Sequence, residues 1–293
     1  MIKHWIKAFR LRTLPLAMAS ISLGSFLAAS QGLFNLRATF LCVLTTLFLQ
    51  ILSNLANDYG DSIHGADHTD REGPQRLVQS GTITSDQMKK AIIIFTILSI
   101  ISGLSLIYGE NLLLFIPLGL LSIVAAITYT VGKKPYGYAG LGDISVFTFF
   151  GIVGVLGSYF LQAHNFNWTL LLPAFACGFF STAVLNVNNI RDINSDKIAG
   201  KNSVPVRLGP HKARIYHCIL LSLGLLSAIG YTIINYNSPW QWLFLVSAPL
   251  LFLNAKNVFI KKTAAEVDPY LKHMAITTLV FVFSFGIGNL IHK

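Results

Sequence analysis

The sequence predicts an all-α integral membrane protein, a bundle of about nine transmembrane helices. Of its 293 residues, 53% are hydrophobic and only 12% are charged, which is about half the charged fraction of an ordinary soluble domain. Apolar stretches recur at close to the twenty residues that a helix needs to cross about 30 Å of hydrocarbon. These stretches do not alternate polar and apolar residues, so the pattern excludes a transmembrane β-barrel.

Nine apolar stretches define the predicted helices in chain order. They are residues 14–34, 38–56, 90–108, 112–131, 144–162, 169–188, 215–235, 239–255 and 274–291. Since each helical residue adds about 1.5 Å, helices of this length use most of the chain. The remainder is an N-terminal segment, two longer loops and several short turns. We therefore expect one transmembrane domain over residues 1–293.

The distribution of positive charge indicates a topology. Although the net charge is +10, 20 of the 22 Lys and Arg residues fall in alternate connecting segments, and only Arg37 and Lys293 fall on the other side. The positive-inside rule places the rich side in the cytoplasm. We expect a multi-pass protein of the cell's inner (cytoplasmic) membrane with a cytoplasmic N-terminus. Its surroundings are the lipid bilayer, and no nucleic-acid partner is predicted.

Acidic residues are few and are concentrated at two predicted helix ends. Seven of the twelve lie in NLANDYGDSIHGADHTDRE (54–72) and NVNNIRDINSD (186–196). If the second predicted helix continues, Asn54, Asp58 and Asp61 share one face, and Asn57 lies one turn before Asp61. In the second stretch Asn188, Asp192 and Asp196 recur every four residues. Each helix end thus presents a column of amide and carboxylate oxygens at the cytoplasmic boundary.

The two columns are expected to face each other. Asp61 and Asp196 stand 135 residues apart with four predicted helices between their own, which suggests an internal pseudo-repeat. Facing carboxylates repel unless a cation lies between them. Mg²⁺ suits this position, because it takes one or two carboxylates and fills its octahedron with water and phosphate oxygens.

Two Mg²⁺ ions would balance Asp58, Asp61, Asp192 and Asp196, and nearby cations would balance a bound diphosphate. The cations available in the same loops are Arg71, Arg76, Lys133, Lys134, Arg191, Lys197, Lys201 and Arg207. A metal-loaded pocket over an apolar bundle suits a diphosphate head that carries a long lipid tail. The alternative is that these acids only solvate the loop ends, but ionisable residues concentrated at membrane helix ends usually mark a site.

These residues resemble the UbiA superfamily of intramembrane aromatic prenyltransferases. Its first motif, roughly NDxxDxxxD, is similar to residues 57–65 here, with Gly65 in place of the last acid. Asp67 and Asp70 follow, and which of them completes the cluster is left open. The second motif, DxxxD, is intact at residues 192–196. RLRTLPLA, REGPQRLVQSG, KPYGYAGLGD and NNIRDINSDKIAGKNSVPVRLG most resemble the branch that acts on 1,4-dihydroxy-2-naphthoate.

The resemblance implies a Mg²⁺-dependent prenyltransferase with its active site at the cytoplasmic side. Asp58, Asp61, Asp192 and Asp196 would hold Mg²⁺ and, with it, the diphosphate of polyprenyl diphosphate. Ionisation would give an allylic cation, which the ring of an aromatic acid attacks. In this branch the attacked carbon loses CO₂, and demethylmenaquinone forms. The candidate substrate-binding residues are Asn54, Asn57, Arg71, Arg76, Lys134, Asn188, Arg191, Lys201, Arg207 and Arg12.

Other residues carry weaker predictions. Tyr129, Tyr136 and Tyr138 face the cation or, as the preferred interpretation, include at least two interfacial aromatics. Arg10 or Arg12 binds the acceptor's carboxylate or only sets topology. Asp143 is interpreted as a helix N-cap rather than as a base or an acceptor ligand. Glu266 and Asp268 are interpreted as surface charges.

The sequence leaves three alternatives to this function. The acceptor in a related enzyme is 4-hydroxybenzoate, haem or a glycerol phosphate lipid. A secondary transporter would place its polar site near the bilayer midplane, whereas here the acids lie at one surface. A membrane phosphotransferase would carry a DGxxAR…GxxxDxxxD motif, which is missing from this sequence. Prenyl chain length and oligomeric state are left open.

Overall fold

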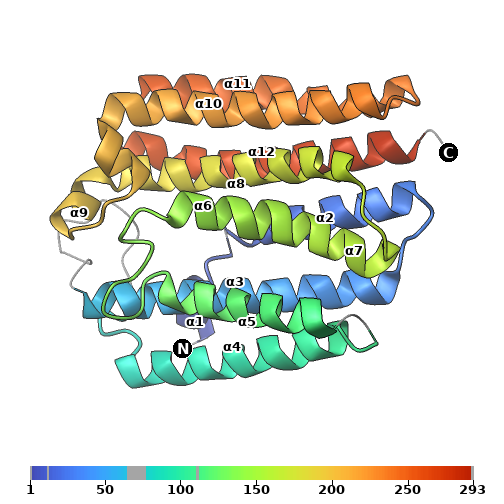
Figure 1. Cartoon of the computed structure of the whole chain (residues 1–293). Coiled ribbons are helices and arrows are strands. Elements are labelled where there is room, and N and C mark those ends of the chain that lie inside the picture. The colour runs from blue at the N-terminus through green and yellow to red at the C-terminus, as the bar shows by residue number, and fades with distance from the viewer. Residues whose placement is uncertain (1, 12, 65–76, 110–111, 292–293) are drawn as a thin grey trace.

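The computed structural model describes residues 2–11, 13–64, 77–109 and 112–291, and within these ranges the regular structure is entirely helical. Figure 1 shows the long helices running side by side along one direction. In chain order the elements are α1 (Ile2–Ala8), α2 (Leu14–Ser30), α3 (Leu36–Ile63), α4 (Ser85–Leu106), α5 (Leu112–Thr128), α6 (Gly142–Val146), η1 (Phe147–Leu156), α7 (Gly157–Ala163), η2 (Trp168–Leu170), α8 (Leu171–Arg191), α9 (Ile193–Ile198), α10 (Val204–Ile234), η3 (Pro239–Ser247), α11 (Ala248–Ile260) and α12 (Ala264–Leu290).

Seven helical segments among the described residues are long and apolar enough to cross a membrane. They are α3, α4, the continuous α6–η1–α7 helix, η2 with α8, α10, η3 with α11, and α12. Two shorter apolar helices, α2 and α5, accompany them. The prediction of an all-α membrane protein is thus confirmed, and every one of these helices coincides with a predicted apolar stretch.

Several helices begin before or end after the predicted stretches, because caps and not only hydropathy set their ends. α4 begins at a capping box in which Thr84 and Gln87 satisfy each other's backbone N–H groups, and Thr263 with Glu266 forms another at the start of α12. Such boxes stabilise a helix start in polar sequence. α3 likewise runs past residue 56 to Ile63, so Asn54, Asp58 and Asp61 do lie on one helix.

The second predicted column is interrupted. α8 ends at Arg191, and Asp192 adopts φ −92° and ψ 10° before the short helix α9 begins. Asn188 and Asp196 therefore lie on different helices, and the expected single column over four-residue steps is wrong. α10 is also bent, because Gly209 has φ 75° and Pro210 follows it, and proline removes a helical hydrogen bond.

The core centres on α8, which packs against α10, η1 and α12. Small residues let two backbones touch there: a Cβ on Gly151 would lie 2.7 Å from the carbonyl oxygen of Ala174 and 2.8 Å from Cα of Gly178. Close approach through small residues is typical of membrane helix pairs. This contact fixes the α6–η1–α7 helix against α8 and leaves its other side to face α2, α3 and α5.

Candidate active site

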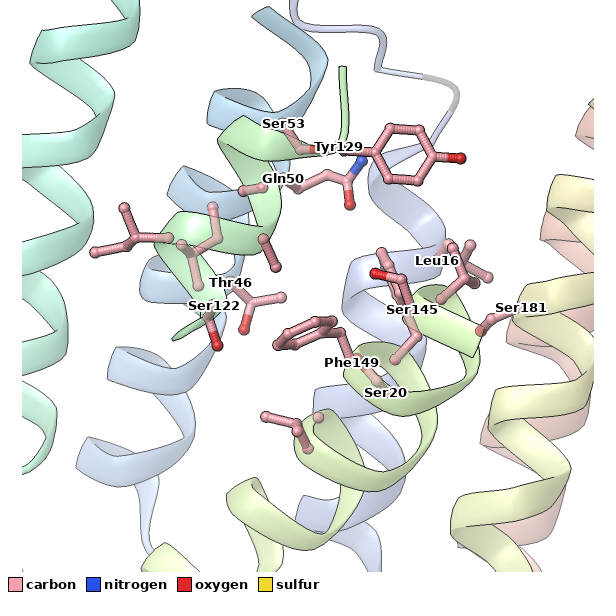
Figure 2. A pocket seen from close by; sticks show the side chains of 18 of the residues that line it. Leu16, Ser20, Thr46, Gln50, Ser53, Ser122, Tyr129, Ser145, Phe149 and Ser181 are labelled. Atoms are coloured by element: carbon pink, nitrogen blue, oxygen red, sulfur yellow. The ribbon is translucent and has the colours of Figure 1, made fainter. Parts of the chain in front are cut away.

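A cavity of about 460 Å³ lies between α2, α3, α4, α5 and the α6–η1–α7 helix. Its polar mouth lies where α3 and α8 end, and its interior is mostly apolar. Figure 2 shows Ser20, Thr46, Ser122 and Phe149 around the same interior space. The mouth is lined by Arg10, Asn54, Asn57, Asp61, Asn188, Asp192, Asp196 and Lys201. Residues of both acidic motifs therefore border one chamber.

Lys201 joins the two motifs directly. Its Nζ lies 3.1 Å from Oδ1 of Asp61 and 3.4 Å from Oδ1 of Asp196. The Tyr138 hydroxyl donates to Oδ1 of Asp61 at 2.9 Å, and the Lys201 ammonium lies 4.9 Å from the centroid of the Tyr138 ring. The cation that facing carboxylates require is, in this structure, a lysine ammonium.

Asp196 lies in α9, just beyond the long helices. Burial raises the pKa of Asp196 to about 6, because a charged carboxylate loses solvation there; the Lys201 ammonium opposes this, and the Asp192 and Asp61 carboxylates add to it. Burial therefore outweighs the attraction of Lys201, and the two neighbouring carboxylates act in the same direction as burial. Additional positive charge at the mouth would stabilise the ionised form.

Asp58 is buried but does not line the cavity. Its Oδ2 accepts a hydrogen bond from the Leu77 backbone N–H at 3.3 Å, and Arg10 attracts it electrostatically. Its Oδ1 is buried without a hydrogen-bond partner among the described residues. On the neighbouring position, Asn57 Oδ1 accepts from the Thr130 hydroxyl at 3.0 Å. The first motif thus has two roles. Asp58 and Asn57 bind the segments around Leu77 and Thr130, and Asn57 and Asp61 border the cavity.

Arg191 is engaged with protein groups. Its side chain is 1% exposed and donates to both oxygens of Asp192, at 2.7 and 2.6 Å, to Oδ1 of Asp268 at 2.6 Å, and to Oδ1 of Asn188 at 3.0 Å. The interpretation of Asp268 as a surface charge agrees with its 39% exposure, but the carboxylate also pairs with the buried Arg191. Arg191 orients Asp192 by a bidentate contact and ties it to α12.

The remaining candidates are dispersed. Asn54 lines the cavity, but its Nδ2 donates to the Phe9 carbonyl at 3.0 Å and to Thr13 at 3.2 Å, which fixes the N-terminal segment. Lys134 is exposed, and neither it nor Arg207 lines the cavity; Arg207 donates to the Gly140 carbonyl at 2.8 Å. Three predicted residues lie outside the described residues, namely Arg12, Arg71 and Arg76. The two candidates for the last acid of the first cluster, Asp67 and Asp70, also lie outside them.

Three tyrosines form one wall of the mouth. Tyr129, Tyr136 and Tyr138 all line the cavity, which favours the alternative that their rings face the substrate; that at least two of them are interfacial aromatics stays a prediction. Tyr129 and Tyr136 pack edge to face with ring centroids 5.3 Å apart, and the Tyr136 hydroxyl donates to the Ala125 carbonyl at 2.9 Å. Burial raises the pKa of the Tyr129 phenol, so its hydroxyl stays protonated.

The donor set fits a hard cation. Among the described residues no three His, Cys, Asp or Glu side chains form a group able to hold a metal ion by themselves. Mg²⁺ does not need such a group, since it commonly takes one or two carboxylates and completes its octahedron with water and phosphate oxygens. Pairs such as Asp61 with Asp196, and the unpartnered buried oxygen of Asp58, match that requirement.

Sequence reasoning missed three contacts. The Tyr138 hydroxyl on Asp61, the Thr130 hydroxyl on Asn57 and the Arg191–Asp268 pair join segments more than 70 residues apart. The sequence offered one weak signal for these contacts. Tyr138 and Asp268 stand in predicted connecting segments that are otherwise short and basic. Spacing along one helix carries no information on such long-range pairs.

A membrane-embedded helical bundle whose apolar cavity opens beneath two acidic motifs is the architecture of an enzyme acting on a lipid with a charged head. The family model described as the UbiA prenyltransferase family matches residues 17–288. The chain belongs to this family.

The chain is similar along its whole length to curated members. It is 48% identical to an Escherichia coli protein named 1,4-dihydroxy-2-naphthoate octaprenyltransferase, over 97% of this chain and 96% of the relative. A Haemophilus influenzae protein of the same name is 47% identical, over 99% and 96%.

Solved structures share the fold. A UbiA homolog from Aeropyrum pernix aligns with a TM-score of 0.70 at 17% identity, over 99% of this chain and 98% of that one. An Archaeoglobus fulgidus homolog bound to GPP and Mg²⁺ aligns with a TM-score of 0.63 at 16% identity, over 97% and 99%.

Proposed function

We propose that this protein transfers a polyprenyl group from polyprenyl diphosphate to 1,4-dihydroxy-2-naphthoate, with loss of CO₂ and diphosphate, to give demethylmenaquinone. The observation that carries the proposal is the 48% identity, over nearly the full length of both chains, to a relative named for that acceptor. The cavity is consistent with it, since a charged mouth above an apolar interior suits a diphosphate with a hydrocarbon tail.

The four motif aspartates, Asp58, Asp61, Asp192 and Asp196, are the proposed holders of two Mg²⁺ ions. A fold neighbour from Archaeoglobus fulgidus was solved with GPP and Mg²⁺, which supports the choice of metal. When bound, Mg²⁺ would neutralise the charge that develops on the departing diphosphate. The proposed diphosphate-binding residues are Asn54, Asn57, Arg71, Arg76, Lys134, Asn188, Arg191, Lys201 and Arg207, and Arg12 is proposed for the acceptor's carboxylate.

Within this set the proposed role of Lys201 has the most direct support. Its ammonium already lies between Asp61 and Asp196, at the point where a diphosphate oxygen would approach the mouth. Arg191, besides its proposed part in diphosphate binding, orients Asp192. Tyr129, Tyr136 and Tyr138 present aromatic rings at the level where an allylic cation forms, and a desolvated cation–π contact contributes about 2 kcal/mol. The apolar walls below exclude water from that cation.

The acceptor assay tests the proposal. Purified protein with Mg²⁺ and one polyprenyl diphosphate is expected to prenylate 1,4-dihydroxy-2-naphthoate and release one CO₂ per product. We expect 4-hydroxybenzoate to be a poor substrate, because its single ring is less electron-rich and fills less of the cavity. Product mass and trapped ¹⁴CO₂ are the measurements. Equal prenylation of 4-hydroxybenzoate, with its carboxylate retained, would sink the naphthoate assignment.

We propose further that the whole chain, residues 1–293, is one domain of nine membrane spans, formed by the seven long apolar segments together with α2 and α5. The mouth of the cavity would face the cytoplasm, in an inner (cytoplasmic) membrane. The support is the concentration of Lys and Arg in the loops at that end of the bundle.

Cysteine labelling in intact cells tests this topology. Gly200→Cys, next to α9, is expected to react with a membrane-impermeant maleimide only after the inner membrane is opened. Asn165→Cys and Asn237→Cys, in turns at the other end, are expected to react in intact spheroplasts. The unsubstituted protein is the background control, since its cysteines are buried or half-buried. Reaction of Gly200→Cys from outside would reverse the orientation.

A further inference from the structure

Asp143 is a buried carboxylate that the proposed diphosphate site does not use. It is the second residue of α6, is 7% exposed and lines the cavity. The helix N-cap is Leu141 and makes no side-chain cap, so the interpretation of Asp143 as an N-cap is wrong. An ionisable side chain inside a membrane bundle is costly and usually serves a function.

The protein satisfies this carboxylate only in part. Tyr216 from α10 donates its hydroxyl to Oδ2 at 2.9 Å. In the described part of the chain no Lys or Arg comes within ion-pair distance of Asp143, although Arg207 attracts it electrostatically. A carboxylate offers about four acceptor positions. Asp143 therefore retains capacity to accept a hydrogen bond from a molecule in the cavity.

The residues around Asp143 indicate the shape and chemistry of the molecule that would bind there. Tyr129 interacts electrostatically with Asp143, Asp196 and Asp61, so it lies near both Asp143 and the acids of the mouth. Its hydroxyl lies close to α6, because a Cβ on Gly142 would be 2.6 Å from it. Figure 2 shows Tyr129, Ser145 and Phe149 about the same space. Aromatic walls with a carboxylate at one edge suit a flat ring that carries a hydroxyl group.

We propose that Asp143 binds a ring hydroxyl of the aromatic acceptor, in a subsite bounded by Tyr129 and Phe149. This inference rests on the proposed function, and it adds where the acceptor lies and which group activates it. The position suits the reaction: C1 of the prenyl group is bonded to the diphosphate at the mouth, and the attacking ring must lie within bonding reach of C1, a condition that a place beside Tyr129 and Asp143 in the same cavity meets.

The carboxylate also assists the bond-forming step. As the ring attacks C1, the new C–C bond forms and the C1–O bond breaks with its electron pair on the diphosphate. The hydroxyl proton moves to Asp143 while the ring oxygen becomes a carbonyl. The C–CO₂ bond then breaks, its electron pair restores the aromatic ring, and the proton returns to the oxygen. Atoms and charge balance without an oxidant, and Tyr216 holds the carboxylate in place throughout.

Asp143→Asn tests this role, because the amide oxygen still accepts from Tyr216 but cannot take the proton. With geranylgeranyl diphosphate and 1,4-dihydroxy-2-naphthoate we expect kcat to fall by about 10²-fold or more. Binding of a non-cleavable geranylgeranyl thiolodiphosphate, measured by Mg²⁺-dependent thermal protection, is expected to stay unchanged. Tyr216→Phe is expected to lower kcat by about tenfold.

Acceptor analogues separate hydroxyl recognition from a structural role. The unsubstituted protein is expected to discriminate strongly against one of the two mono-methoxy analogues of the naphthoate, and Asp143→Asn is expected to lose that discrimination. Asp86→Asn, an exposed acid on α4, is the control. An active protein whose Asp143→Asn variant keeps both its turnover and its discrimination would overturn the inference. An unsubstituted protein that fails to prenylate the naphthoate would instead overturn the proposed function.

Discussion

Asp61→Asn is expected to lower kcat by about 10²–10³-fold, the scale seen when a preorganised electrostatic group is removed from an active site. Asp61 lines the cavity mouth and accepts from both Tyr138 and Lys201. The amide keeps the size of the side chain and can still accept from Tyr138, so the packing is retained. What it loses is the negative charge that a Mg²⁺–diphosphate pair requires. Turnover at saturating donor over a range of Mg²⁺ concentrations is the measurement.

The matched control is Asp86→Asn, whose carboxylate is 86% exposed and pairs only loosely with Lys89 at 3.6 Å. Losses of similar size are expected for Asp58→Asn, Asp192→Asn and Asp196→Asn, and chelation of Mg²⁺ should abolish turnover in the unsubstituted protein. Near-normal activity in any two of the four variants would show that the motif aspartates are not the metal site.

Arg191→Met is expected to lower the free energy of unfolding by about 3–5 kcal/mol, the cost of removing one partner from a buried ion pair. The guanidinium serves Asp192, Asp268 and Asn188 at once. Its loss removes the bidentate donor of the 3%-exposed Asp192. Unfolding of the purified protein by SDS in mixed micelles measures the change.

Lys89→Met is the comparison, since its partner Asp86 is exposed and such pairs contribute about 1 kcal/mol or less. The double variant Arg191→Met with Asp192→Asn removes the charge left behind, and part of the lost stability should return. Equal losses from Arg191→Met and Lys89→Met would contradict the buried role of Arg191.

Much of the fold follows from the length and composition of the apolar segments in the sequence. Apolar length located every long helix, because burial in hydrocarbon is decided by the composition of the segment itself. The ends were less predictable: residues 57–63 are polar yet helical in α3, since the helix continues into the mouth. The break at Asp192 also escaped prediction, because the four-residue spacing of Asn188, Asp192 and Asp196 is compatible with an unbroken helix.

For the candidate site, the sequence predicted which residues belong to the site but not which residues contact one another. Asp61, Asp196 and Lys201 were singled out from their motifs, and the structure places all three at one point. Arg191 was assigned to substrate because a basic residue beside a motif suggests a phosphate ligand, whereas in the fold it is surrounded by Asp192, Asp268 and Asn188. Asp268 reaches it from α12, and no local pattern encodes a contact between residues 77 positions apart.

The contact of one ammonium with carboxylates on α3 and α9 has an evolutionary consequence. Lys201, Asp61 and Asp196 share a single charge balance, so a substitution at any one of them changes the selective value of the residues at the other two. A neutral residue at Lys201 would remove the ammonium that contacts both acids, and a neutral residue at Asp61 would remove one of the lysine's two carboxylate contacts. Descendants of this gene should therefore retain or exchange the three positions together, even though Asp61 and Asp196 stand 135 positions apart in the sequence.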